Sequence, residues 1–187
     1  FYYMPIETPI CDFGQKAIPF ELKSTENSII SLNDIKGDNG TLVMFICNHC
    51  PYVKAVTKEI VEDCNELKKI GINAVAICSN DAVSHPEDSF ENMIEFSKLN
   101  NFNFPYLVDE TQEIAKAYDA VCTPDFFGYN KNLELQYRGR LRELKNLIPV
   151  KDGESDLLKA MKQIAETSEG PKEQIPSAGC GIKWKIN

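Results

Sequence analysis

Apolar residues follow two different spacings along this chain, and the spacing predicts where strands and helices lie. Continuous apolar runs at residues 41–46 and 72–78 are bounded by turn residues, which favours strands buried on both faces. Between them, apolar residues recur at steps of three and four from residue 51 to about 70, which predicts an amphipathic helix that ends at Gly71. Right-handed crossover of this unit predicts two parallel strands in one sheet.

The flanking segments carry hairpin signals. Residues 17–23 and 28–32 predict a hairpin before the crossover, and residues 126–129 and 133–137 predict an antiparallel hairpin that closes the sheet. Residues 104–108 predict a short strand between them.

Three further helices are predicted from capping residues. Ser84 and Glu87 have the spacing of a capping box, which predicts a helix from there to about residue 99. Asp109 is expected to cap a helix that runs through Tyr118, and Ser155 to cap a last helix. Strands that alternate with helices in this way predict an α/β fold with a central mixed sheet.

Length and composition predict one domain with a core of its own. The chain has 187 residues, of which 43% are hydrophobic and 26% are charged, and it contains no repeat and no long linker. Residues 1–167 are expected to form the domain. Residues 168–187, which are rich in glycine and proline, are expected to form a tail that packs on it.

Charge and hydropathy exclude several classes of partner. Twenty basic and twenty-eight acidic residues give a net charge of −8, without the dense Lys/Arg clusters that bind nucleic acid. No apolar run approaches the roughly 20 residues of a membrane span, and no secretion signal is recognised, so we expect a cytoplasmic protein. No glycine-rich nucleotide fingerprint is present, and no cofactor is expected.

The strongest chemical signal is the run Cys47-Asn48-His49-Cys50-Pro51, where a predicted strand gives way to a helix. Proline is favoured as the first helical residue, so Pro51 makes Cys50 the N-cap. A thiolate there faces free backbone N–H groups, which lower a cysteine pKa below about 8.5. We therefore interpret Cys50 as a nucleophile, with Cys47 close enough for a disulfide and His49 able to stabilise the thiolate when protonated.

The remaining cysteines leave other interpretations open. The seven cysteines are odd in number, so at least one thiol is free. Cys64 and Cys78 fall on apolar patterns and are predicted to be core residues. A soft metal such as zinc or copper(I) is an alternative use of the site thiols, its candidate ligands being Cys47, His49, Cys50 and Cys122.

Motifs spread along the chain carry a family resemblance. They are residues 14–17, 20–22, 31–34, 45–52, 104–109, 117–124, 137–140 and 179–185. The sequence resembles the redoxins of the alkyl hydroperoxide reductase/thiol-specific antioxidant superfamily (AhpC/TSA), in particular the peroxiredoxin-like branch. This resemblance covers roughly residues 12 to 165 and implies a thioredoxin-like fold with an N-terminal β-hairpin extension.

Two alignments compete at the site. In the thioredoxin alignment, Cys47 attacks and Cys50 resolves. In the redoxin alignment, Cys50 takes the place of the first cysteine and Val53 replaces the second, which agrees with the position of Pro51. Cys50-Pro51 also resembles a peroxidatic site, but the Pro-x-x-x-Thr/Ser-x-x-Cys pattern is missing. The loose candidates for the cation of such a site are Arg138, Arg140 and Arg142.

The resemblance adds residues outside the motif. Thr123-Pro124 resembles the cis-proline loop that faces the active cysteine, where the residue before the proline pairs with an extended substrate peptide. Cys122 and Cys180 are each either a resolving thiol or a structural one.

The function implied is a thiol-based oxidoreductase. Its cysteine would attack a disulfide or a peroxide, a second thiol would resolve the product, and an external thiol reductant such as thioredoxin or a small thiol would reset it. The substrate would be a protein disulfide or a peroxide, and a homodimer is compatible. The alternatives are a dedicated thiol peroxidase and a metal-binding module without turnover.

Overall fold

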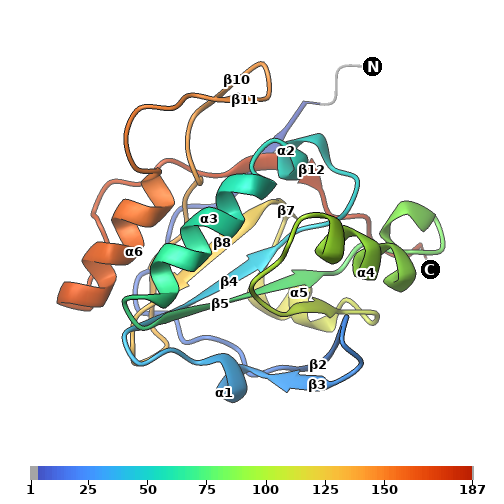
Figure 1. Ribbon diagram of the computed structural model, residues 1–187, viewed down its shortest axis with the longest axis horizontal. Coiled ribbons are helices and arrows are strands. Elements are labelled where there is room, and N and C mark those ends of the chain that lie inside the picture. The colour runs from blue at the N-terminus through green and yellow to red at the C-terminus, as the bar shows by residue number, and fades with distance from the viewer. Residues whose placement is uncertain (1–3, 187) are drawn as a thin grey trace.

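The computed structural model describes residues 4–186 and shows a mixed sheet covered by helices on both faces (Figure 1). Residues 1–3 of the predicted domain (1–167) and residue 187 of the predicted tail (168–187) lie outside the described residues. The strands are β1 (Ile6–Glu7), β2 (Glu21–Ser24), β3 (Ile29–Ser31), β4 (Gly40–Phe45), β5 (Ile72–Cys78), β6 (Tyr106–Val108), β7 (Cys122–Thr123), β8 (Asp125–Tyr129), β9 (Leu135–Tyr137), β10 (Leu144–Lys145), β11 (Ile148–Pro149) and β12 (Ala178–Gly181). The helices are α1 (Leu32–Ile35), α2 (Pro51–Lys54), α3 (Thr57–Lys68), α4 (Phe90–Leu99), α5 (Glu113–Tyr118) and α6 (Asp156–Thr167), with a 3-10 turn η1 (Pro86–Asp88).

The main sheet has seven strands in the order β3-β2-β6-β5-β4-β8-β9. Strand β5 lies parallel to both β4 and β6, which confirms the predicted crossover. The two predicted hairpins are also confirmed, because β2 pairs antiparallel with β3, and β8 with β9. The α/β class with a mixed central sheet is therefore correct.

The central strands are apolar throughout because each face of the sheet has its own core. Leu42 and Met44 of β4 pack in the core that includes α3 and α6, whereas Val43 and Phe45 pack in the core that includes α1 and α5. Successive side chains of a strand point to opposite faces, so a strand covered on both sides needs a continuous apolar run. Within residues 4–186, no helix combines the length and the apolar content needed to cross a membrane.

The single helix predicted from residue 51 to about 70 is wrong, since the structure breaks it into α2 and α3 at Ala55 and Val56. The hydroxyl of Thr57 donates to the carbonyl of Val53 at 2.7 Å. Val56 leaves regular helical geometry with φ −115° and ψ −2°. A side chain that competes for a backbone acceptor in this way bends or interrupts a helix.

Two predicted helix starts also need correction. Ser84 does not cap a helix, because its hydroxyl donates to Asp81 at 2.8 Å, and α4 is capped by Ser89 instead. Asp109 lies four residues before α5, yet its carboxylate accepts the N–H groups of Ile114 and Ala115. Ser155 caps α6 as predicted, accepting from the N–H of Leu158.

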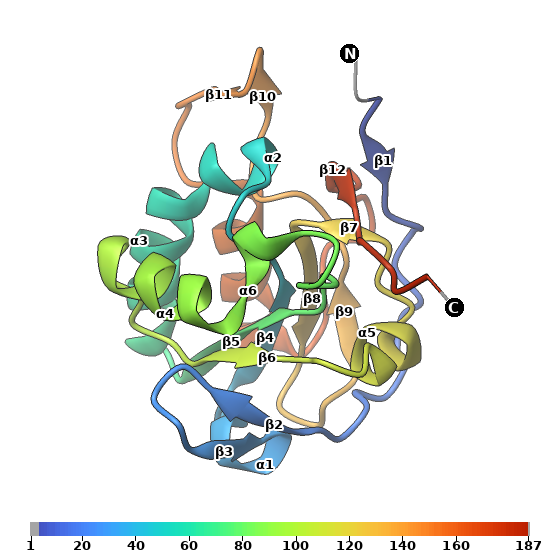
Figure 2. The same ribbon diagram turned by 90° about the vertical axis from the view of Figure 1, so that its right-hand side faces the viewer.

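The C-terminal segment contributes a strand that the sequence analysis did not predict. Strand β12 lies between β1 and β7 and pairs antiparallel with both (Figure 2). This three-stranded sheet brings the two ends of the chain together beside α2, which also contacts β12.

Candidate active site

Cys50 lies where the loop after β4 enters α2. It is the N-cap of α2, with φ −68° and ψ 125°, and Pro51 is the first helical residue, which confirms the N-cap predicted from the sequence. The first backbone N–H groups of a helix have no partner within it. The Cys50 thiol therefore stands next to donors that favour a negative charge.

The loop that carries Thr123 and Pro124 faces both thiols of the motif. The Cys50 Sγ lies 3.4 Å from the carbonyl oxygen of Thr123, and the Cys47 Sγ lies 3.5 Å from its Oγ1. The Thr123–Pro124 peptide bond is cis, as the resemblance implied. Cys50 is fully buried and Cys47 almost so, and all seven cysteines are free thiols.

The environment of Cys50 stabilises its thiolate. The thiol of Cys47 is the largest influence, and together with donors from Cys180 and Thr123 it lowers the pKa of Cys50 to about 5 in spite of burial. The same interaction with Cys50, together with burial, raises the pKa of Cys47 far above its ordinary value. Burial and then Cys50 raise the pKa of Cys180 to about 12. Of these three thiols, Cys50 alone is ionised at neutral pH.

His49 lies between the two cysteines in the sequence, and its neighbours favour the protonated form of its ring. Its Nδ1 lies 2.6 Å from the Oδ2 of Asp88, which makes the contact an ion pair when the ring is protonated. Asp88 raises the pKa of His49, and the charge of Cys50 raises it further. Burial would raise the pKa of Asp88, but His49, Asn80 and the N–H of Asn48 outweigh it and lower that pKa.

Asp88 is a site residue that sequence reasoning missed. It lies in η1, some forty positions after the motif, and is 2% exposed. Its Oδ1 accepts the N–H of Asn48 at 2.8 Å, and the Asn48 side chain in turn accepts the hydroxyl of Tyr106. Nothing in the local pattern marks it, since acidic residues are ordinary in the first turn of a helix.

Replacing Asp88 with asparagine should lower the pKa of His49. Asparagine keeps an oxygen that can accept from Asn48, whereas the charge that stabilises the imidazolium is lost. NMR titration measures this directly because the chain has two histidines. The rings of His49 and His85 stack with their centroids 5.9 Å apart, so the His49 signals are assigned in a His85→Gln variant. An unchanged titration of His49 would contradict the ion pair.

The other predicted site residues lie in different surroundings. The Cys122 thiol donates to the carbonyl of Pro124 at 3.7 Å, and burial raises its pKa. The three arginines considered as peroxide-binding cations are each paired with a carboxylate, namely Arg138 with Asp125, Arg140 with Asp156 and Arg142 with Glu59. Cys64 and Cys78 are buried in the core, as predicted.

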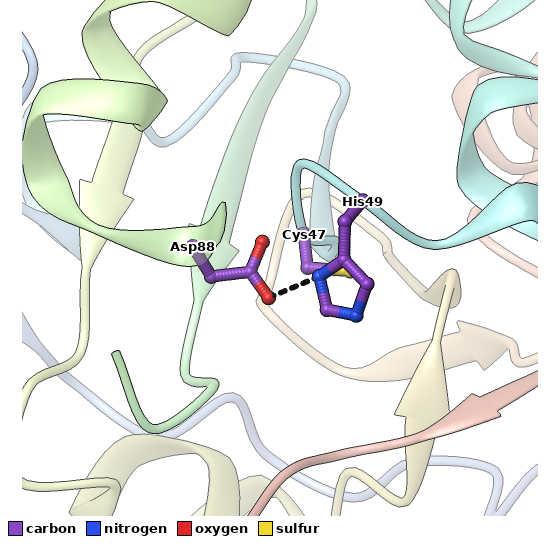
Figure 3. A group of neighbouring side chains, drawn as sticks. All are labelled: Cys47, His49 and Asp88. Atoms are coloured by element: carbon purple, nitrogen blue, oxygen red, sulfur yellow. Dashed lines mark ion pairs between the residues drawn. The ribbon is translucent and has the colours of Figure 1, made fainter. Parts of the chain in front are cut away.

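The set that could hold a metal differs from the predicted one. Cys47, His49 and Asp88 place one ligand atom each within 4.8 Å of one another (Figure 3). The Cys122 thiol instead donates to the cis-proline carbonyl. The Nδ1 of His49 and the Oδ2 of Asp88 already contact each other, so a metal would have to separate an ion pair. The arrangement fits a charged dyad beside the thiols better than an open metal site.

Solved structures that resemble this chain include two that match over nearly its full length. An uncharacterized conserved protein from Geobacillus kaustophilus is 43% identical, covers 100% of both chains and has a TM-score of 0.93. A hypothetical protein from Sinorhizobium meliloti 1021 is 32% identical over 98% of this chain and 100% of its own, with a TM-score of 0.89.

More distant structural similarity identifies the fold, and a family model identifies the family. The thioredoxin domain of a thiol-disulfide oxidoreductase from Bacteroides vulgatus has a TM-score of 0.58 at 16% identity, covering 67% of this chain and 86% of that one. No curated protein matches the sequence. The AhpC/TSA family profile matches residues 13–143, more than half of the chain. The chain therefore belongs to the AhpC/TSA family and has a thioredoxin-like fold.

Proposed function

We propose that this protein is a thiol-disulfide oxidoreductase in which Cys50 is the nucleophile. The observation that carries the proposal is the Cys50 thiol at the start of α2, with its pKa lowered to about 5 and its Sγ 3.4 Å from the carbonyl of Thr123. A thiolate, rather than a thiol, attacks disulfides.

The reaction begins when the Cys50 thiolate attacks one sulfur of a disulfide. The sulfur–sulfur bond of the substrate breaks, half of the substrate stays on Cys50 as a mixed disulfide, and the other half leaves as a thiolate. The His49 imidazolium supplies a proton for the leaving sulfur, and the ring takes a new proton from water, which Asp88 favours by raising the pKa of the ring. A second thiol of the site then attacks Cys50 and releases the remaining half. An external thiol, such as a small thiol or thioredoxin, reduces the new disulfide.

Peroxide reduction is the second candidate, because the same thiolate can attack a hydroperoxide and become a sulfenic acid. The surroundings favour disulfides over peroxides. Cys47 stands three residues before Cys50, where a peroxidatic pattern has threonine or serine. None of the three candidate arginines is left without a carboxylate partner.

Site-resolved alkylation tests the proposal. Iodoacetamide modification of Cys50 is measured by mass spectrometry of its peptide at a series of pH values. The rate should be constant above pH about 7 and should fall as the pH is lowered, with a midpoint at pH about 5. Cys47→Ala removes the largest stabilising donor, so the midpoint should move upward. A wild-type midpoint near 8.5, the ordinary cysteine value, would rule out the activated nucleophile.

A further inference from the structure

Strand β12 occupies the edge of β7 at which an extended peptide would otherwise pair. Cys180 lies opposite Thr123 and Gly181 opposite Cys122 in antiparallel register. The other edge of β12 is paired with β1, where Ile6 lies opposite Gly179. The backbone beside the cis-proline is therefore already paired with the chain itself.

The glycines on either side of Cys180 explain how the strand lies so close. A side chain at Gly179 would place its Cβ 1.9 Å from the carbonyl oxygen of Thr123, so only glycine fits there. The backbone of β12 must then pass directly over the residue that contacts both motif thiols. Residues opposite each other in an antiparallel pair project to the same face, so Cys180 shares the face of the Thr123 side chain.

The segments on both sides of β12 hold the strand in place. Before it, the hydroxyl of Ser177 donates to the carbonyl of Pro124 at 2.7 Å. After it, the N–H of Lys183 donates to Asn80 and the carbonyl of Lys183 accepts from Gln112, both at 2.9 Å. These contacts make β12 a fixed part of the site rather than a loose tail.

We propose that β12 is a built-in substitute for a substrate peptide, that Cys180 is the thiol that resolves Cys50, and that the substrates are low-molecular-weight disulfides. This inference rests on the proposed function of Cys50. The Cys50 thiolate takes one half of a small disulfide and releases the other as a thiolate. Cys180 then passes its proton to the first thiolate released, attacks the Cys50 sulfur and expels the second half as a thiolate that water protonates, leaving a Cys50–Cys180 disulfide and two small thiols.

The contacts favour Cys180 over Cys47 as the resolving thiol. Cys180 is partly exposed and lies on the strand opposite Thr123, whereas Cys47 is 1% exposed and its Sγ contacts the Thr123 Oγ1. Thr123, the residue opposite Cys180 in the sheet, contacts the Cys50 Sγ through its carbonyl oxygen, so the strand register places Cys180 near Cys50. Cys122 is directed to the carbonyl of Pro124 instead.

A cavity lies next to residues that neighbour the site in sequence, although none of the site thiols lines it. It has a volume of about 470 Å³ and lies between the start of α2, the cis-proline and β12. The cavity is lined in part by Tyr52, Pro124 and Ala178. Each of them lies one or two positions along the chain from Cys50, Thr123 or Cys180. An extended protein segment cannot pair with β7 beside the cis-proline, because β12 already fills that edge.

Disulfide mapping tests the resolving thiol. Reduced protein treated with one equivalent of bis(2-hydroxyethyl) disulfide, alkylated and digested, should yield a Cys50–Cys180 disulfide by mass spectrometry. Cys180→Ser should stop at the mixed disulfide on Cys50, and Cys11→Ser, a substitution far from the motif in sequence, should behave as the wild type. A Cys47–Cys50 bridge, or a lasting mixed disulfide in the wild type, would overturn the inference and leave the proposed function standing. Lack of any reaction at Cys50 would overturn the proposed function itself.

Substrate competition tests the role of β12. Wild-type protein should reduce bis(2-hydroxyethyl) disulfide at least about tenfold faster than the interchain disulfides of insulin, since the peptide edge is occupied. In Gly179→Ala the new methyl group clashes with the carbonyl of Thr123, so β12 cannot stay paired there. The ratio of the two reduction rates should therefore fall. Gly181→Ala is the matched control, because its Cβ meets only the flexible end of Ile6. Equal rates with both substrates in the wild type would overturn the proposal, and thermal melts of the two variants verify that both remain folded.

Discussion

Replacing Cys50 with serine should reduce turnover of a disulfide substrate by roughly a thousandfold or more, because no other group forms the mixed disulfide. The fold should tolerate this change. Serine is a favoured N-cap residue, and its hydroxyl can accept from the free N–H groups of α2. The free energy of unfolding should therefore change by less than about 0.5 kcal/mol.

The measurement pairs a kinetic assay with denaturation of the same samples. Turnover of bis(2-hydroxyethyl) disulfide is followed with a thiol reductant, and urea unfolding is followed by circular dichroism. Cys11→Ser is the control, since Cys11 lies outside the motif and burial raises its pKa to about 11. Residual turnover near the wild-type level in Cys50→Ser, together with a loss in Cys47→Ser, would assign the attack to Cys47 instead.

The central layers of the fold are predictable from the sequence because burial on two faces leaves a strong pattern. Strand β5 occupies residues 72–78 as predicted, and β4 differs from its predicted range by one residue at each end. A short continuous apolar run that ends at turn residues favours a buried strand over other secondary structure. Helix ends are less well predicted, since the choice of Ser89 over Ser84 depends on Asp81, which already binds the Ser84 hydroxyl.

Some site residues are recognisable from a local sequence pattern, whereas others come from distant positions in the chain and are not. Cys50 was placed at an N-cap because Pro51 alone fixes the start of the helix. Asp88 could not be found, since its partners Asn48 and His49 lie about forty positions away and no pattern connects them. Strand β12 was missed because it is short and contains two glycines, which are poor strand formers. Its stability comes from pairing with β1 and β7, both known only from the structure.

A buried ion pair fixes the loop that faces Cys50. Asp125 is completely buried and Arg138 is 6% exposed, with the Arg138 Nη2 2.9 Å from the Asp125 Oδ2. Asp125 also accepts the N–H of Val121, and Arg138 donates to the carbonyl of Asp119. The pair thus ties together both ends of the segment that carries Thr123 and the cis-proline.

Replacing Arg138 with methionine should lower the free energy of unfolding by about 3–5 kcal/mol, because it leaves the Asp125 carboxylate buried without a counter-charge. Urea denaturation at neutral pH measures the loss. Arg140→Met is the matched control, since its partner Asp156 is well exposed and such pairs contribute at most about 1 kcal/mol. Equal losses in the two variants would show that the buried pair contributes no more than a surface pair.

The pH dependence separates a lost charge partner from lost packing. Burial already raises the pKa of Asp125 against the influence of Arg138, and without the guanidinium that pKa should rise further. A carboxyl whose pKa is higher in the folded state than in the unfolded state loses stability as the pH rises through the folded value. The deficit of Arg138→Met should therefore be larger at pH 8 than at pH 5, and Asp125→Asn in the same chain should remove most of this difference. A deficit independent of pH would mean that the contact of Arg138 with the Phe127 ring, rather than its charge, holds the loop. Because the loop places Thr123 against Cys50, the variant should also show a shifted alkylation midpoint at Cys50.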